Sequence, residues 1–212
     1  MDDPRPARAD DVPAIRTVCA LAYAENPLMA WVLPVRSTRE DACAAWLGPA
    51  LERYVDIGYV DVLTAGAVGE GADRPDEVVA VAAWRPRHAD GAPEPPPRLP
   101  RPAGVLRALV GPSRAEEVLA ALGDTAAYAP PHAGAYLNYL AVHPAYQGRG
   151  LGGVLLQHGL RALAGSPWRG TPWLATSDPH NVPFYARRGF AVAGSHVLGV
   201  DGPRLTVMHG RG

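Results

Sequence analysis

The sequence contains no lysine, so all 20 of its basic side chains are arginines. Without lysine the chain has neither an amine for a Schiff base nor the phosphate-binding residue of a Walker loop. The 20 arginines are nearly balanced by 21 acidic residues, which leaves a net charge of −1. No overall positive field is available to gather nucleic acid or anionic lipid, and we predict neither as a partner.

Cysteine and long apolar runs are also scarce. The two cysteines, Cys19 and Cys43, lie in stretches with helical periodicity, which indicates buried, reduced thiols rather than a disulfide framework. The first residues, MDDPRPARADD, are charged and lack an apolar segment, so they predict neither a secretory signal nor a membrane span. We expect a cytoplasmic protein, and we predict no metal site.

The sequence does have enough apolar material for one core. Of its 212 residues 48% are hydrophobic, and we predict a single domain over residues 1–212. Apolar spacing and capping residues predict helices from Asp10, from Thr38 with a kink or break at Pro49, and over 103–122, 151–164 and 181–188. Runs rich in β-branched residues predict strands over 59–65, 77–84, 135–142, 171–176, 190–199 and 204–209. The prolines of 85–102 are too dense for either and favour an extended polyproline conformation.

The stretch HPAYQGRGLGG, residues 143–153, joins a predicted strand to a predicted helix and fits two patterns. Its glycines fit the dinucleotide-binding pattern G-x-G-x-x-G, whereas QGRGLG fits Q-x-x-G-x-G, a loop that holds the pyrophosphate of an acyl-CoA. In a dinucleotide fold the first glycine follows the strand almost directly, and an acidic residue ends the next strand. Here HPAYQ intervenes, and the nearest suitable acid, Asp178, lies past the strand end. The spacing therefore favours acyl-CoA.

Three segments carry a family resemblance. LAVHPAYQGRGLGGVLL closely resembles the cofactor-binding segment of the GNAT acetyltransferases, and ATSDPHNVPFYARRGF resembles the segment that follows it, with Asn181 and Tyr185 in the N-x-x-x-Y positions. RPARADDVPAIRTVCALAYAENP resembles the first strand and helix of the family. Within the family, four segments look most like puromycin N-acetyltransferase and its relatives: RADDVPAIRTV, DIGYV, TSDPHNVPFYARRGF and GPRLTVM. Residues 85–130 resemble that enzyme weakly.

The resemblance implies the α/β GNAT fold, with a mixed sheet of about six or seven strands and helices on both faces. It implies that the sheet is splayed between 135–142 and 172–176, and that the pantetheine arm of acetyl-CoA lies in the gap. The backbone of Leu140, Ala141 and Val142 would pair with this arm like an added strand. The other implied cofactor contacts are Gln147, Gly148, Arg149, Gly150, Leu151, Gly152, Asn181 and Tyr185.

For catalysis we predict that Tyr185 offers its phenolic proton to the leaving thiolate. Candidates for the acceptor cleft are Tyr23, Asn26, Trp31, Trp84, Tyr136 and Asn138. Period-two alternation places Tyr136, Asn138 and Leu140 on one strand face. Many family members carry a carboxylate or histidine at the first two of these positions, but this chain has no base there. His143 and His180 flank the loops and are interpreted as turn or surface residues.

Together these observations predict an enzyme that transfers acetyl from acetyl-CoA to a small-molecule amine by direct attack, as a monomer or homodimer. An aminonucleoside or amino acid amide of the puromycin type is the acceptor that the resemblance suggests. Two alternatives stay open. A protein N-terminal or lysine acetyltransferase would need a long open groove, which the proline-rich stretch would cover. A non-catalytic acyl-CoA-binding regulatory module is disfavoured by the retention of Tyr185.

Overall fold

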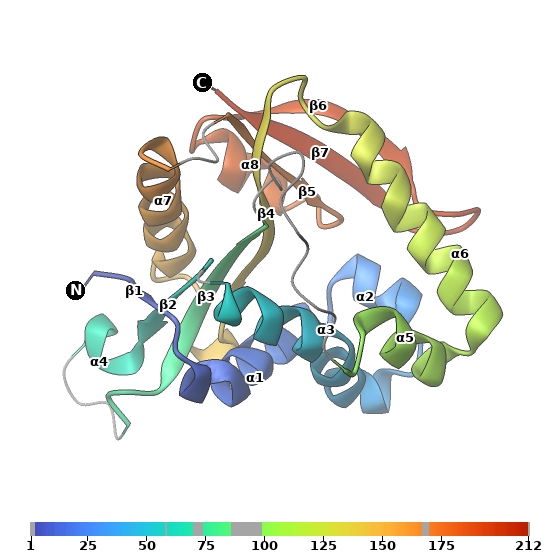
Figure 1. Ribbon diagram of the computed structural model, residues 1–212, viewed down its shortest axis with the longest axis horizontal. Coiled ribbons are helices and arrows are strands. Elements are labelled where there is room, and N and C mark those ends of the chain that lie inside the picture. The colour runs from blue at the N-terminus through green and yellow to red at the C-terminus, as the bar shows by residue number, and fades with distance from the viewer. Residues whose placement is uncertain (1–2, 58, 70–73, 86–98, 167–169, 212) are drawn as a thin grey trace.

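A computed structural model describes residues 3–57, 59–69, 74–85, 99–166 and 170–211. The strands of these residues form one seven-stranded sheet in the order β1-β2-β3-β4-β5-β7-β6 (Figure 1). The pair β4–β5 is parallel and the other pairs are antiparallel, which confirms the predicted mixed sheet. The strands are β1 (Arg5–Pro6), β2 (Val60–Thr64), β3 (Val78–Arg85), β4 (Ala133–Val142), β5 (Thr171–Thr176), β6 (Phe190–Val197) and β7 (Arg204–Gly210).

Helices cover both faces of the sheet. One face packs against α1 (Val12–Tyr23) and α3 (Arg39–Asp56), and the other against α7 (Leu151–Ala164) (Figure 1). The remaining helices are α2 (Pro27–Val32), α4 (Ala65–Val68), α5 (Pro102–Val110), α6 (Pro112–Gly123) and α8 (Asn181–Ala186), with the 3₁₀ turns η1 (Ala9–Asp11), η2 (Arg36–Thr38), η3 (Asp124–Tyr128) and η4 (Pro144–Tyr146). No helix in the described part of the chain is long and apolar enough to cross a membrane.

A β-bulge at Asn138 decides which way the side chains of β4 point. Ala83 pairs with Tyr139 and Trp84 with Leu137, so Asn138 is an extra residue without a partner on β3. Beyond the bulge the alternation is reversed, and Leu137 and Leu140 both pack on the α7 side. The prediction that Tyr136, Asn138 and Leu140 share one face is therefore wrong, because strict alternation assumes a strand without a bulge.

Four helix predictions also need correction. Pro49 does not divide α3, whose apolar face is buried against the sheet; that burial outweighs the roughly 3 kcal/mol cost of an interior proline. Gly111, with φ +82°, splits the predicted helix 103–122 into α5 and α6. Helix α2, capped by Asn26, was not predicted. The predicted helix 181–188 is shorter in the structure, where α8 spans Asn181–Ala186 and its N-cap is His180.

Trp84 lies in the core beneath α7, where its side chain is 3% exposed. A Cβ atom on Gly159 of α7 would overlap the Trp84 ring, so this glycine allows the helix to approach the sheet. Trp84 does not line the cavity described below, and the prediction that placed it in the acceptor cleft is wrong. The structure shows Trp84 as a packing residue of the core.

Gly159→Ala is expected to destabilise the fold by about 1–3 kcal/mol, because the added methyl group overpacks the Trp84 site. Gly104→Ala is the matched control: Gly104 lies inside α5, and nothing lies within 4 Å of the position of its Cβ. That change should stabilise the protein by up to about 1 kcal/mol, since alanine is the better helix former. Urea unfolding measures both, and equal stability of the two variants would contradict the packing argument.

Candidate active site

The strands β4 and β5 separate at the centre of the sheet. Their ladder pairs Tyr136 with Trp173 and Leu137 with Leu174, and no pair follows, although β4 continues to Val142 and β5 to Thr176. This is the splay that the resemblance implied. Backbone groups that face such a gap need partners other than a neighbouring strand.

Side chains supply two of these partners. The Tyr23 hydroxyl donates to the carbonyl oxygen of Leu140 (3.0 Å) and accepts from the Leu140 N–H (2.8 Å). Gln147 Nε2 donates to the carbonyl oxygen of Val142 (3.1 Å). Leu140 and Val142 thus direct backbone groups into the gap, as a strand-like ligand requires. A ligand that bonds to Leu140 must displace the Tyr23 hydroxyl.

A cavity of about 490 Å³ opens beside the gap. Helices and strands far apart in the sequence meet in its walls, which include residues of α1, α2, α3, α5, α6, α8, η3, β3, β4, β5 and β7. Several residues predicted for the site line it together: Tyr23, Asn26, Tyr136, Asn138, Leu140, Asn181 and Tyr185.

Trp31 does not line the cavity, and the prediction that placed it there is wrong. Its indole donates to Asp201 (3.1 Å), and the guanidinium of Arg114 lies over its ring at 4.2 Å. Trp31 therefore joins α2 to α6 and to the turn between β6 and β7.

The sequence interpretation missed other lining residues. Trp46, Leu47, Arg85, Leu119, Thr125, Trp173 and Ser177 are among them. Most lie on helices or strand ends whose pattern resembles any buried element, so only Arg85, a charge at the end of an apolar strand, offered a signal in the sequence.

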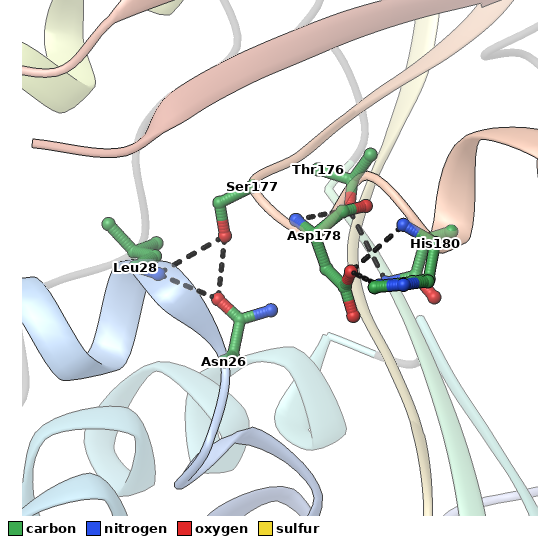
Figure 2. Close-up of polar contacts among 7 residues, drawn as sticks. Asn26, Leu28, Thr176, Ser177, Asp178 and His180 are labelled. Carbon is green, nitrogen blue, oxygen red and sulfur yellow. Dashed lines mark hydrogen bonds and ion pairs between the residues drawn. The ribbon is translucent and has the colours of Figure 1, made fainter.

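A hydrogen-bonded triangle closes the cavity wall between α2 and the loop after β5 (Figure 2). The Ser177 hydroxyl donates to Asn26 Oδ1 (2.6 Å), and the Leu28 N–H donates to Asn26 Oδ1 (2.9 Å) and to Ser177 Oγ (3.3 Å). Asn26 is thus both the N-cap of α2 and a bridge to β5. The triangle holds the two sides of the cavity at a defined separation.

Tyr185 lies on α8 with its ring between Phe184 and Phe190, whose centroids are 5.0 Å and 6.0 Å away. The side chain is buried (8% exposed), yet it lines the cavity. Burial, and secondarily the neighbouring Tyr136, raise the pKa of Tyr185 above its ordinary value. The phenol is therefore held in its protonated form.

Neither flanking histidine reaches the cavity. The His180 ring is 92% exposed and its Nδ1 lies 2.9 Å from Asp178 Oδ1 (Figure 2). His143 Nδ1 accepts from the Ala145 N–H (3.2 Å) at the start of η4. Among the described residues that line the cavity there is no histidine and no carboxylate. The described walls of the cavity therefore contain neither of the side-chain types that most often act as a general base.

The loop 147–152 joins β4 to α7 through two glycines in the left-handed region, Gly148 (φ +77°) and Gly150 (φ +81°). Nothing lies within 4 Å of the positions where their Cβ atoms would be. Among the described residues, none of the N–H groups of 148–152 donates to another backbone group, apart from the ordinary ladder inside α7. These free donors at a helix N-terminus form a cradle for an anion.

Comparisons with known proteins agree with this geometry. Residues 114–192 match the model of the acetyltransferase (GNAT) domain. A solved structure from Corynebacterium glutamicum, described as histone acetyltransferase HPA2 and related acetyltransferase, is similar at TM-score 0.64 and 23% identity, over 98% of this chain and 94% of that chain.

Two further solved structures have the same fold at lower identity. The mosquito arylalkylamine N-acetyltransferase-like 5b is similar at TM-score 0.58 and 14% identity, over 97% of each chain. A PaiA N-acetyltransferase from Thermoplasma acidophilum, solved with coenzyme A, is similar at TM-score 0.54 and 12% identity, over 100% of both chains.

Proposed function

We propose that this protein, an acetyl-CoA-dependent N-acetyltransferase with the GNAT fold, transfers the acetyl group to the amine of a small molecule by direct attack. The observation that carries the proposal is the cavity beside the splay of β4 and β5, which contains Tyr185 and has no described carboxylate or histidine in its walls. Such a cavity suits an acceptor amine that arrives without its proton.

The chain's own residues fit acetyl-CoA. The pyrophosphate would lie against the free N–H groups of 148–152, where the α7 macrodipole favours negative charge and Arg149, which is exposed, adds a charge-assisted contact. The pantetheine arm would pair with the backbone of Leu140 and Val142, with the Asn181 amide as a further partner. When bound, acetyl-CoA supplies an activated acyl group.

Tyr185 acts on the sulfur end of the reaction. Its protonated phenol donates a hydrogen bond to the leaving sulfur, whose charge increases as the thioester bond breaks. Full transfer of the proton would be uphill by about 2 kcal/mol on reference pKa values of about 10 and 8.5, and by more here because burial raises the pKa of Tyr185. The phenol therefore stabilises the developing charge while the amine loses its proton to water.

The described walls of the cavity contain no histidine or carboxylate, and this favours an acceptor amine of low pKa. Freeing a lysine-like amine of pKa about 10.4 at pH 7 costs about 4.6 kcal/mol, whereas an α-amino group of pKa about 7.8 costs about 1.1 kcal/mol. We infer that α-amino acid amides or aminonucleosides of the puromycin type are better acceptors than alkyl amines and lysine side chains. The resemblance of RADDVPAIRTV and GPRLTVM supports this class.

At pH 7, kcat/KM for phenylalanine amide is expected to exceed that for phenethylamine, which has the same aromatic body but an amine of higher pKa. Release of free thiol from acetyl-CoA measures both rates. A preference for phenethylamine would mean that a base acts in the site. Faster acetylation of a long N-terminal or lysine peptide would favour a protein acceptor. If none of the amines and peptides tested leads to release of thiol, the result would favour a non-catalytic acyl-CoA-binding module.

We also infer that the protein works as one domain in the cytoplasm, as a monomer or homodimer. All described strands belong to one sheet, which supports the single domain. Cys19 and Cys43 are free and buried, which is typical of proteins kept in a reducing compartment.

A further inference from the structure

The cavity has one charged lining residue among those that the structure describes, Arg85 at the end of β3. Its guanidinium lies over the ring of Tyr136, 4.7 Å from the centroid. The ring supports one flat face of the guanidinium and leaves its N–H edge free to bind. Arg85 also lines a second, adjoining cavity of about 330 Å³, together with Tyr136 and Trp173. It therefore lies where the two cavities meet.

A second polar group in the same cavity lacks a partner. Thr125, in η3, is 8% exposed and lines the larger cavity, and its Oγ1 has no hydrogen-bond partner among the described residues. A buried hydroxyl without a partner is unfavourable. The Oγ1 atom is itself covered, and a change of the Thr125 χ1 rotamer would turn it toward a ligand atom in the cavity. The turn η3 leads directly to Ala129 and Pro130, which line the second cavity with Arg85. Both groups therefore line the larger cavity, and the chain that follows Thr125 runs into the wall of the cavity that Arg85 shares.

We propose that the acceptor amine carries an anionic group, a carboxylate or a phosphate, which Arg85 binds with the Thr125 hydroxyl as a further donor. This inference rests on the proposed function and names the substrate class more closely. The N–H edge of a guanidinium matches the paired oxygens of both anions. The absence of carboxylates from the described cavity walls excludes competing charge and disfavours acceptors with a second cationic group.

The ladder sets the distance between the two ends of this acceptor. Arg85 pairs with Tyr136, whereas Ala82 pairs with Leu140, beside which the acetyl group would lie. Three residue steps along β3 separate the two positions, which is about 10 Å at about 3.3 Å per residue. The backbone of Arg85 is therefore about 10 Å from the position beside the acetyl group, and we take this as the span of the acceptor from its nitrogen to its acid. The aromatic and apolar wall residues would contact the part of the acceptor between them.

Three probes of equal length test the proposal. Phenylalanyl-glycyl-glycine spans about 10 Å from its amine to its carboxylate when extended. Its C-terminal amide removes the charge, and its analogue that ends in aminomethylphosphonic acid distinguishes a phosphate-like group from a carboxylate. We expect kcat/KM for the acid or the phosphonate to be about tenfold higher than for the amide, mainly because KM is lower. The expected preference is no larger than this because Arg85 is exposed to solvent, which weakens its attraction for an anion.

Arg85→Gln should bring the ratio of acid to amide to about one, with kcat for the acid changed much less than KM. Arg161→Gln on α7, which does not line the cavity, is the matched control and should keep the wild-type ratio. Thr125→Val should raise KM for the acid about threefold, because the anion loses a donor. The melting temperature of this variant should equal or exceed that of the wild type, because the change removes an unpaired buried hydroxyl. A residue with a purely structural role would not separate binding from stability in this way.

The outcomes separate this proposal from the proposed function. If no probe or simple amine is acetylated, the proposed function fails. If all three probes are acetylated equally well by the wild type, the function stands and the anion proposal is wrong. The anion proposal is also wrong if Arg85→Gln retains the preference for the acid.

Discussion

Tyr185→Phe is expected to lower kcat by about 10- to 1,000-fold and to leave the Kd of acetyl-CoA nearly unchanged. The change removes the phenolic hydrogen and keeps the ring, so the contacts with Phe184 and Phe190 remain. The hydroxyl acts on charge that develops at sulfur only in the transition state, and its loss should therefore affect the chemical step rather than binding. Steady-state kinetics and calorimetry measure the two quantities.

Tyr54→Phe is the control for the loss of a tyrosine hydroxyl at a partly buried position outside the cavity. Tyr54 packs edge-on against Tyr139 (6.0 Å) but does not line the cavity, so kcat should stay within about twofold of the wild type. An unchanged kcat in Tyr185→Phe would leave Tyr185 with a packing role only.

The raised pKa of Tyr185 also predicts a pH profile. The active form is the protonated phenol, and a raised pKa extends that form to higher pH. With an acceptor of low pKa, kcat should therefore not fall between about pH 7 and about pH 9.5. A fall within that range that Tyr185→Phe abolishes would mean that the phenol ionises near its ordinary pKa.

Gly150→Asp is expected to abolish measurable binding of CoA. A carboxylate at this position would face the pyrophosphate across the free N–H groups of 148–152, so the loop would repel the group that it is proposed to hold. The left-handed backbone of Gly150 tolerates aspartate better than most residues, and the open space around its Cβ position accommodates the side chain. Calorimetric titration of the folded variant with CoA measures the effect.

Gly150→Asn is the matched control, because asparagine has the same shape, tolerates the same backbone and carries no charge. It should weaken CoA binding by much less than Gly150→Asp does, and both variants should unfold at similar urea concentrations. Equal CoA affinity in the two variants would mean that no phosphate lies beside the loop. Binding of a nicotinamide dinucleotide to the wild type would restore the rival interpretation of the glycines.

Local patterns allowed some elements to be predicted closely. The helix 151–164 and the strand 171–176 have the predicted bounds, because each is a continuous apolar pattern with clear ends. The loop between β4 and α7 was recognised because its glycines need backbone angles and space that few residues tolerate. Predictions failed where the pattern was not local: Pro49 stays within α3, and Asn138 forms a bulge that reverses the alternation of β4.

The candidate site divides in the same way. The sequence by itself determined the glycine loop, Tyr185, and the absence of a base at Tyr136 and Asn138, since those follow from residue types in a short segment. Only the tertiary structure decided that Trp84 and Trp31 lie outside the cavity and that Arg85 and Thr125 line it. The structure also decided that the Tyr23 hydroxyl bonds to the backbone N–H and carbonyl oxygen of Leu140. These positions depend on how α1, α6 and the sheet pack, and contacts between residues so distant in the chain leave no period or motif in the sequence.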